Sequence, residues 1–230
     1  MKKMISITFL LASSIATVCL PSCKEDPIGP PTPVPTSVTD IDGNVYPVKQ
    51  IGTQIWMTEN LRTARYKDGT TIATGLTALN WAVSTLGAYA IYDDEPNNNA
   101  THGKLYNWQA VNSQKLAPEG YHVATTDEWN QLLNHLGGFA VAGGKMKSTA
   151  TIWNAPNTGA DNSSGFNALP SGFRGTTGSY TALGNLAYFW SATERNATQA
   201  NYTNLQQDMA SALSNGATKT FGYSVRCVKN

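Results

Sequence analysis

A run of prolines divides this chain into a leader and a folding unit. Residues 27–37 contain five of them: Pro27, Pro30, Pro31, Pro33 and Pro35. Proline lacks a backbone N–H and fixes φ, so this density excludes helix and sheet and favours polyproline II. At about 3.1 Å per residue, the stretch from Cys23 to Val38 spans about 45 Å. We expect a semi-rigid tether over residues 23–38. A single domain should fill residues 39–230, because no second linker or low-complexity run follows.

The residues before the tether predict an exported, lipid-anchored protein. Lys2 and Lys3 precede an apolar stretch, residues 4–20, as in a secretory signal peptide. The following tetrapeptide, Leu20-Pro21-Ser22-Cys23, resembles the bacterial lipobox, in which the cysteine is acylated and becomes the new N-terminus. Acyl chains contribute roughly 0.8 kcal/mol per buried methylene, so two or three form a lasting anchor. We predict a signal peptide over residues 1–22 and lipidation of Cys23. An ordinary signal peptide cleaved nearby is the alternative.

The charged residues that follow Cys23 indicate where the anchored protein resides. Lys24-Glu25-Asp26 resembles the surface-export signal of lipoproteins from Bacteroidetes. We therefore expect an outer-membrane protein that is held by its lipid and faces the cell exterior. A solvated charged stub without a targeting role is the alternative.

The composition limits which partners the protein can bind and what its core can contain. Sixteen Lys and Arg against fifteen Asp and Glu give a formal net charge of +1. Nucleic-acid binding depends largely on basic residues that neutralise phosphates, so we expect no nucleic-acid partner. Polarity comes instead from uncharged residues, including 20 Asn and 27 Thr. Cys227 is the only cysteine of the domain, which excludes an intramolecular disulfide and favours a small buried core residue.

Apolar periodicity predicts an α+β fold. Residues 45–51 and 54–57 should form a hairpin around Gly52-Thr53, and residues 223–228 alternate like a half-buried strand. From residue 152 onward, Asn, Gly and Ser punctuate short apolar pieces, which predicts short strands joined by long loops.

Three helices are expected between these strands, over residues 105–111, 125–136 and 139–146. The second is the most strongly marked, because Thr125 and Glu128 form a capping box ahead of an apolar stripe. The third is weakened by Gly143 and Gly144.

A series of motifs, in order from about residue 40 to the C-terminus, resembles one family. Among them are Gly103-Lys104-Leu105-Tyr106-Asn107-Trp108, Gly172-Phe173-Arg174, Phe189-Trp190-Ser191-Ala192-Thr193-Glu194 and Gly222-Tyr223-Ser224-Val225-Arg226-Cys227. They are similar to the Fibrobacter succinogenes major paralogous domain, a family found largely in secreted or lipid-anchored proteins of Bacteroidetes and Fibrobacteres, with no established activity.

The resemblance implies a fold similar to C-type lectins and to sulfatase-modifying factors, the formylglycine-generating enzymes. In that architecture two helices pack beside a small, twisted, mainly antiparallel sheet, and a loop-rich half lies on top. The terminal strands pair as neighbours, so the resemblance predicts that residues 45–51 pair with residues 223–228.

The sequence carries no recognisable set of catalytic residues. Formylglycine-generating enzymes use a pair of cysteines, whereas Cys227 stands alone. His102, His122 and His135 lack the spacing of metal ligands, and helix capping explains Glu128. We expect a non-enzymatic domain that binds a glycan or a surface protein, in adhesion or polysaccharide handling. An enzyme or accessory factor acting on cell-surface or dietary polysaccharide is the alternative.

One acidic, Asn-rich stretch offers the oxygen ligands that calcium prefers. Its candidate ligands are Asp93, Asp94, Glu95 and Asn97. Glu95-Pro96-Asn97 also looks like the triplet with which C-type lectins hold calcium, but here it precedes both main helices, whereas the lectin triplet follows them. Trp153-Asn154-Ala155 lacks the acid of the second lectin motif. We expect a solvated turn and no cofactor, with calcium binding as the alternative.

Aromatic residues offer another route to a sugar, whose ring stacks on Trp and Tyr faces. Trp108, Trp129 and Trp190 lie on apolar patterns and are expected in the core. Candidates for a ligand-binding surface lie instead in polar, loop-like surroundings: Trp81, Trp153 and Tyr180.

Overall fold

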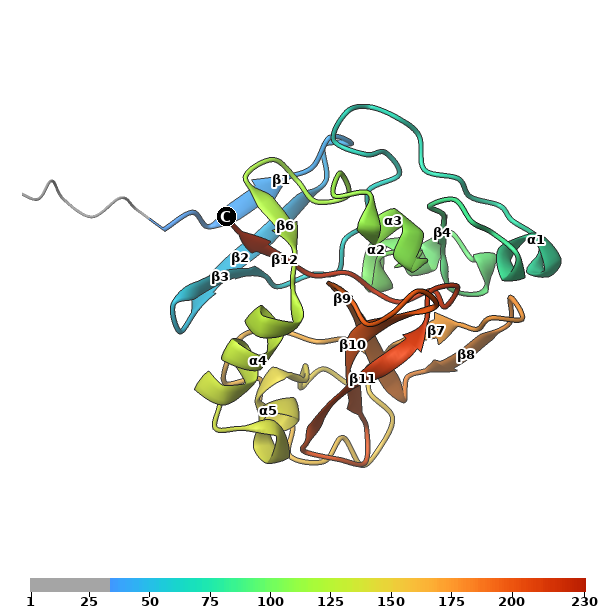
Figure 1. Cartoon of the computed structure of the whole chain (residues 1–230). Coiled ribbons are helices and arrows are strands. Elements are labelled where there is room, and N and C mark those ends of the chain that lie inside the picture. The colour runs from blue at the N-terminus through green and yellow to red at the C-terminus, as the bar shows by residue number, and fades with distance from the viewer. Residues whose placement is uncertain (1–33) are drawn as a thin grey trace, which may run out of the picture. The chain divides into compact units, whose positions relative to one another are not determined.

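The computed structural model describes residues 34–230 (Figure 1). The predicted signal peptide, Cys23 and most of the predicted tether lie outside these residues. The first strand begins at Ser37, slightly before the predicted start of the domain at residue 39. Within the described residues, no helix combines the length and hydrophobicity needed to cross a membrane.

The first sheet contains the two ends of the domain. Its five antiparallel strands lie in the order β1 (Ser37–Thr39), β2 (Val45–Ile51), β3 (Gln54–Met57), β12 (Cys227–Lys229) and β6 (Tyr121–Val123). Alternation defines β2, in which Tyr46 and Val48 are buried while Val45 and Lys49 are exposed. The register from Val48 opposite Met57 to Ile51 opposite Gln54 confirms the predicted hairpin.

The expected pairing of residues 45–51 with residues 223–228 is wrong. Val228 of β12 lies opposite Trp56 of β3 and His122 of β6, not opposite β2. The reason is that both edges of β2 are already occupied, by β3 on one side and by β1 on the other. The two ends of the domain therefore share a sheet without being neighbours.

The second half of the chain contains a second five-stranded sheet where short strands and long loops were expected. The strands lie in the order β11 (Ala212–Thr218), β10 (Gln199–Gln206), β9 (Leu186–Glu194), β7 (Ser171–Arg174) and β8 (Tyr180–Leu183). Neighbours are antiparallel except β7 and β9, which are parallel. Many positions in β10 and β11 are polar, occupied by Asn, Gln, Ser or Thr. The sequence of these strands therefore lacks a clear apolar alternation.

The helix with the capping box is confirmed. α4 (Thr126–His135) starts after Thr125, whose hydroxyl accepts a hydrogen bond from the Glu128 backbone. The Glu128 carboxylate accepts the Thr125 N–H at 2.8 Å and also contacts His122 Nε2 at 2.7 Å. Trp129 and the leucines one turn further on form its buried stripe.

The helix over residues 139–146 is confirmed as α5 (Phe139–Met146), and its two glycines are needed for packing. A Cβ at Gly143 would lie 2.3 Å from Ser211 O, and one at Gly144 would lie 2.2 Å from Gly159 O. The glycines that weaken the helix in the sequence therefore let its backbone approach the loops beside β11.

The predicted helix over residues 105–111 is shorter than expected. Leu105 and Tyr106 form β5 (Leu105–Tyr106), which pairs with β4 (Tyr89–Ala90). Asn107 then caps α3 (Trp108–Asn112) by accepting the Ala110 N–H. Three short helical segments precede it: α1 (Ala78–Ala82), η1 (Tyr92–Asp94) and α2 (Asn97–His102).

Three apolar clusters form the core, and the smallest consists of Trp81, Ala88 and Ala90. The first includes Tyr46, Trp108 and Trp190, and the second includes Trp129 and Phe166. Trp108, Trp129, Trp190 and Cys227 are all buried, as predicted. The structure is thus a mixed α and β domain, mostly sheet with few helices.

Candidate ligand-binding surface

Strand register gathers aromatic side chains on one face of the second sheet. Tyr202 lies opposite Trp190 and Asn204 opposite Tyr188, and directly opposed residues of antiparallel strands share a face. On the other face, Phe189 and Leu205 belong to the core cluster that includes α4 and α5 residues. Tyr188 and Tyr202 therefore point away from these helices.

A segment near the C-terminus extends this face. Gly222 bridges to Arg174 of β7, and Ser224 bridges to Phe189 of β9, so the segment lies between these two strands. It adds two rings to those of the strands. We call the resulting set the aromatic row; its members are Phe173, Tyr188, Tyr202, Phe221 and Tyr223.

The rings of the aromatic row are in mutual contact. The centroids of Tyr188 and Tyr223 lie 4.7 Å apart with an interplanar angle of 18°, and those of Phe221 and Tyr223 lie 5.4 Å apart at 26°. Tyr188 also lies 5.2 Å from Phe173 and 5.3 Å from Tyr202. Tyr223 is buried at the centre, while the four surrounding rings are half-exposed. The row therefore presents several ring surfaces to solvent, held in place by each other.

Within residues 34–230, three phenol hydroxyls of the aromatic row have no partner, two of them on the half-exposed Tyr188 and Tyr202. Among the described residues, those of Tyr188, Tyr202 and Tyr223 make no hydrogen bond, and none is a fully buried unpaired atom. By contrast, the hydroxyl of Tyr46 donates to Asp40 at 2.6 Å. Burial, and secondarily the nearby Tyr202, raises the pKa of Tyr188, and burial followed by the nearby Tyr188 and Tyr202 raises the pKa of Tyr223. At neutral pH each hydroxyl is therefore protonated and available both as donor and as acceptor.

Uncharged side chains of β10 and β11 lie beside the aromatic row, and one cation, Arg195, donates to Asn215 Oδ1 at 3.1 Å. On the same face, Asn204 lies beside Tyr188, and Gln206 follows on β10. On β11, Leu213 lies opposite Asn204 and is 41% exposed, and Asn215 lies opposite Tyr202. Rings, hydroxyls and amides without charge suit a neutral, hydroxyl-rich ligand, because the rings cover its C–H faces and the polar groups pair with its hydroxyls.

The predicted exposure of Trp81 and Trp153 is wrong, so the structure contradicts the reason for choosing them as ligand-binding residues. Trp81 is 1% exposed and its indole N–H donates to Thr220 O at 2.8 Å. Trp153 is 5% exposed and donates to Ala168 O at 2.9 Å. Each indole is polar only at one atom, and a backbone carbonyl supplied by a distant segment satisfies that atom in the interior.

Tyr180, the third predicted residue, is half-buried and belongs to a cluster that includes Trp81. Its hydroxyl donates to Asp94 Oδ1 at 2.6 Å, and the Arg174 guanidinium lies 5.0 Å from its ring centre. Arg174 also lies 4.5 Å from the ring centre of Trp81 and donates to Leu76 O. The structure thus joins Trp81, Tyr180 and Asp94 around one buried arginine. With its faces and hydroxyl engaged inside the protein, Tyr180 offers less to a ligand than the aromatic row does.

The predicted calcium ligands lie on an exposed turn. Asp93, Asp94, Glu95 and Asn97 are all exposed, and Asp93 and Asp94 adopt positive φ angles of 56° and 55°. Within residues 34–230, no group of three or more His, Cys, Asp and Glu side chains is placed to hold a metal ion.

We expect the melting temperature of the 34–230 fragment to be the same in millimolar calcium and in chelator. Calcium at a hundredfold excess over Kd would add about 2.7 kcal/mol of stability, which corresponds to a shift of roughly 5 to 11 °C. Differential scanning calorimetry measures this directly. A shift in the wild type that disappears when Asp93 and Glu95 are both changed to Ala would contradict the expectation.

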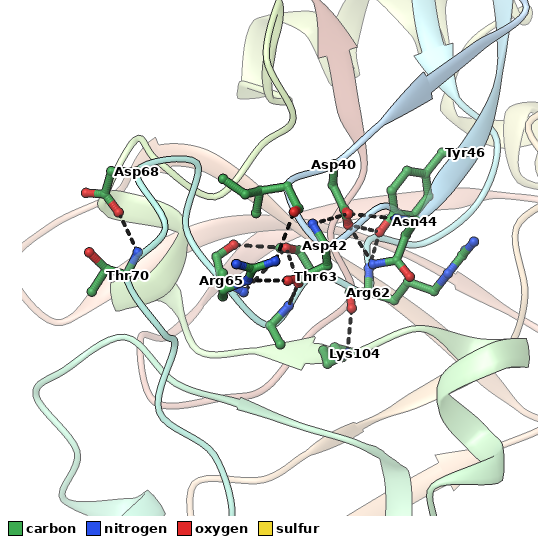
Figure 2. Close-up of polar contacts among 12 residues, drawn as sticks. Asp40, Asp42, Asn44, Tyr46, Arg62, Thr63, Arg65, Asp68, Thr70 and Lys104 are labelled. Carbon is green, nitrogen blue, oxygen red and sulfur yellow. Dashed lines mark hydrogen bonds and ion pairs between the residues drawn. The ribbon is translucent and has the colours of Figure 1, made fainter.

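A polar network at the start of the domain is structural (Figure 2). Asp42 accepts hydrogen bonds from Ala64 N at 2.5 Å, Arg65 Nε at 2.6 Å and Thr63 Oγ1 at 2.9 Å. Burial raises the pKa of Asp42, but these hydrogen bonds outweigh it and lower the pKa below its usual value. The network connects the turn between β1 and β2 to residues 62–65. The Asp42 carboxylate is occupied by these hydrogen bonds.

The aromatic row is not predictable from the sequence. Its five rings come from positions as distant as Phe173 and Tyr223, and only strand register brings them together. The available signal was the concentration of aromatic residues in the motifs around residues 188–190 and 221–223, but these patterns predict only a core position for Trp190 and a half-buried strand over residues 223–228.

Comparison with known proteins gives one match. The model of the Fibrobacter succinogenes major domain matches residues 49–229. No curated protein and no solved structure matches the chain significantly. The matched region includes the whole second sheet, the first sheet except β1 and the start of β2, and every residue of the aromatic row. The chain therefore belongs to the Fibrobacter succinogenes major domain family.

Proposed function

We propose that this protein is a lipid-anchored outer-membrane protein whose domain binds a neutral glycan at the cell surface without catalysing a reaction. The observation that carries the glycan assignment is the aromatic row, with three phenol hydroxyls that make no hydrogen bond among the described residues. The hydroxyls and amides beside the ring faces can pair with the hydroxyls of a sugar, and on this ground we favour a glycan over a protein ligand. A fold related to C-type lectins, inferred from the sequence motifs, agrees with this function.

A binding role is favoured over hydrolysis by the same face. Glycosidases need two carboxyl groups flanking the scissile bond. From Leu186 to Trp190 on β9 and from Tyr202 to Gln206 on β10, the residues around the aromatic row are uncharged. An enzyme or accessory factor for polysaccharide remains the alternative, and hydrolysis of a bound glycan would identify it.

The test of glycan binding is an array of neutral and acidic glycans probed with the 34–230 fragment, with and without calcium. We expect binding to neutral glycans that does not depend on calcium. The matched variant changes Tyr188 and Tyr202 to Ala, which removes two half-exposed rings without touching the buried Tyr223. Binding only to acidic glycans, or binding that requires calcium, would contradict the proposal.

The anchor is tested separately. Replacement of Cys23 by Ala removes the acceptor for the acyl chains, so we expect the protein to leave the membrane fraction. Fractionation followed by a carbonate wash measures this, with Cys227→Ala as the control cysteine variant that should stay with the membrane. Protease treatment of intact cells reports whether the domain faces the exterior. A Cys23→Ala protein that resists the carbonate wash would show that another segment holds it.

A further inference from the structure

Strand β6 is the edge of the first sheet, with β12 as its only neighbour among the described strands. Figure 1 shows the two strands side by side. Two hydrogen bonds fix which groups face β12: Ala124 N donates to Arg226 O, and Asn230 N donates to Gly120 O. Backbone groups alternate in direction along a strand, so those of Tyr121 and Val123 point outward.

Most of these outward groups lack a partner. The Tyr121 N–H donates to Pro118 O at 3.1 Å. The Tyr121 carbonyl and both the N–H and the carbonyl of Val123 make no hydrogen bond within residues 34–230. Along the strand these three free groups are an acceptor, a donor and an acceptor. An edge with such groups can pair with one more extended strand.

A hollow of about 390 Å³ runs along this edge, and Tyr121, His122 and Val123 of β6 all line it. Beside β6, apolar side chains line it, among them Val111, Leu116, Ala117 and Ala192. The Tyr121 side chain also lines it and is 8% exposed, with a buried hydroxyl that has no partner. Asn112 and Gln114 contribute exposed amides.

Lys67 places a positive charge at the rim of the hollow. Lys67 is exposed, lines this hollow and makes no side-chain hydrogen bond or ion pair among the described residues. An acidic side chain of a bound ligand would therefore find an available partner there.

We propose that the β6 edge and this hollow form a second binding site, distinct from the aromatic row, that takes an extended peptide segment of another protein by β-strand addition. The peptide supplies two N–H groups and one carbonyl to the edge, an apolar side chain to the hollow and an acidic side chain to Lys67. The chain's own tether is a poor occupant, because Pro27, Pro30, Pro31 and Pro33 have no N–H to donate.

The probe is the peptide acetyl-Thr-Val-Thr-Val-Thr-Glu-amide, titrated into the isotope-labelled 34–230 fragment and followed by NMR. We expect saturable binding and slower hydrogen exchange of the Val123 amide. Two N-methylated versions carry methyl groups on the odd or on the even residues. Only one edge of a strand faces the protein, so one version should lose at least tenfold in affinity and the other should bind like the parent peptide.

Variants separate this site from non-specific binding. Asn112→Trp should block the hollow and weaken binding, whereas Asn134→Trp on the exposed side of α4 is the matched control and should not. Lys67→Glu should weaken binding of the probe and favour a version with Lys in place of its Glu. Equal effects of the two methylation patterns, unchanged exchange of Val123, or no binding at millimolar peptide would overturn the proposal. Val123 protection in a peptide-free dimer would also overturn it, by identifying a second copy as the occupant.

Discussion

Replacement of Arg226 by Met is expected to lower the free energy of unfolding by about 4 kcal/mol. The guanidinium is fully buried and donates to four oxygens, none of which is a carboxylate. Its Nε donates to Asn60 Oδ1 at 2.8 Å, and its Nη atoms donate to the carbonyls of Met57, Phe166 and Asn167. Methionine fills a similar volume but leaves these acceptors buried without donors.

Chemical denaturation of the 34–230 fragment measures this loss. Arg65→Met is the matched control, because Arg65 is 45% exposed in its ion pair with Asp42 and should contribute no more than about 1 kcal/mol. Equal stability losses in the two variants would contradict the account. So would an Arg226→Met protein as stable as the wild type.

Replacement of Lys147 by Met is expected to cost about 3 kcal/mol, or a fall in melting temperature of roughly 6 to 12 °C. Lys147 is buried, and its ammonium donates to Thr158 O, Gln206 O and Met209 O at 2.8 to 2.9 Å. These carbonyls come from separate segments, so one side chain holds the loop after α5 against the end of β10. Calorimetry measures the shift, with the less buried Lys145→Met as the control. A smaller effect at Lys147 than at Lys145 would contradict this role.

The contribution of Lys147 also depends on pH. Burial lowers its pKa to about 8, against an unfolded value of 10.5. Between these values the unfolded chain binds the proton and the folded protein releases it, so rising pH favours folding through this group. We expect the stability difference between wild type and Lys147→Met to grow from pH 8 to pH 10.5. A difference that is constant or falls over this range would show that burial does not lower this pKa.

Local signals in the sequence predicted the elements that depend on neighbouring residues. The Thr125 and Glu128 capping box set the start of α4, and the turn at Gly52 set the first hairpin. Periodicity predicts Asn107 inside a helix. Asn is a preferred N-cap residue, and in the structure Asn107 occupies the N-cap of α3.

Pairing between distant strands could not be predicted in this way. β1 occupies the free edge of β2, and this moves the C-terminal strand next to β3. Burial of Trp81 depends equally on distant segments, since Arg174 covers its ring and Thr220 accepts its N–H. The aromatic row has the same origin, because its rings meet only once β7, β9, β10 and the C-terminal segment are in register.

The central claim is that the aromatic row binds a neutral glycan, and calorimetric titration tests it most directly. A neutral glycan that binds on the array is titrated into wild type, into Tyr188→Ala with Tyr202→Ala, and into Tyr180→Ala. The double variant should lose at least about tenfold in affinity, because it removes two half-exposed rings and their hydroxyls. Tyr180→Ala should bind like wild type, since Tyr180 is engaged by Asp94 and Arg174 outside the row. Unchanged affinity in the double variant, or a loss confined to Tyr180→Ala, would contradict the claim.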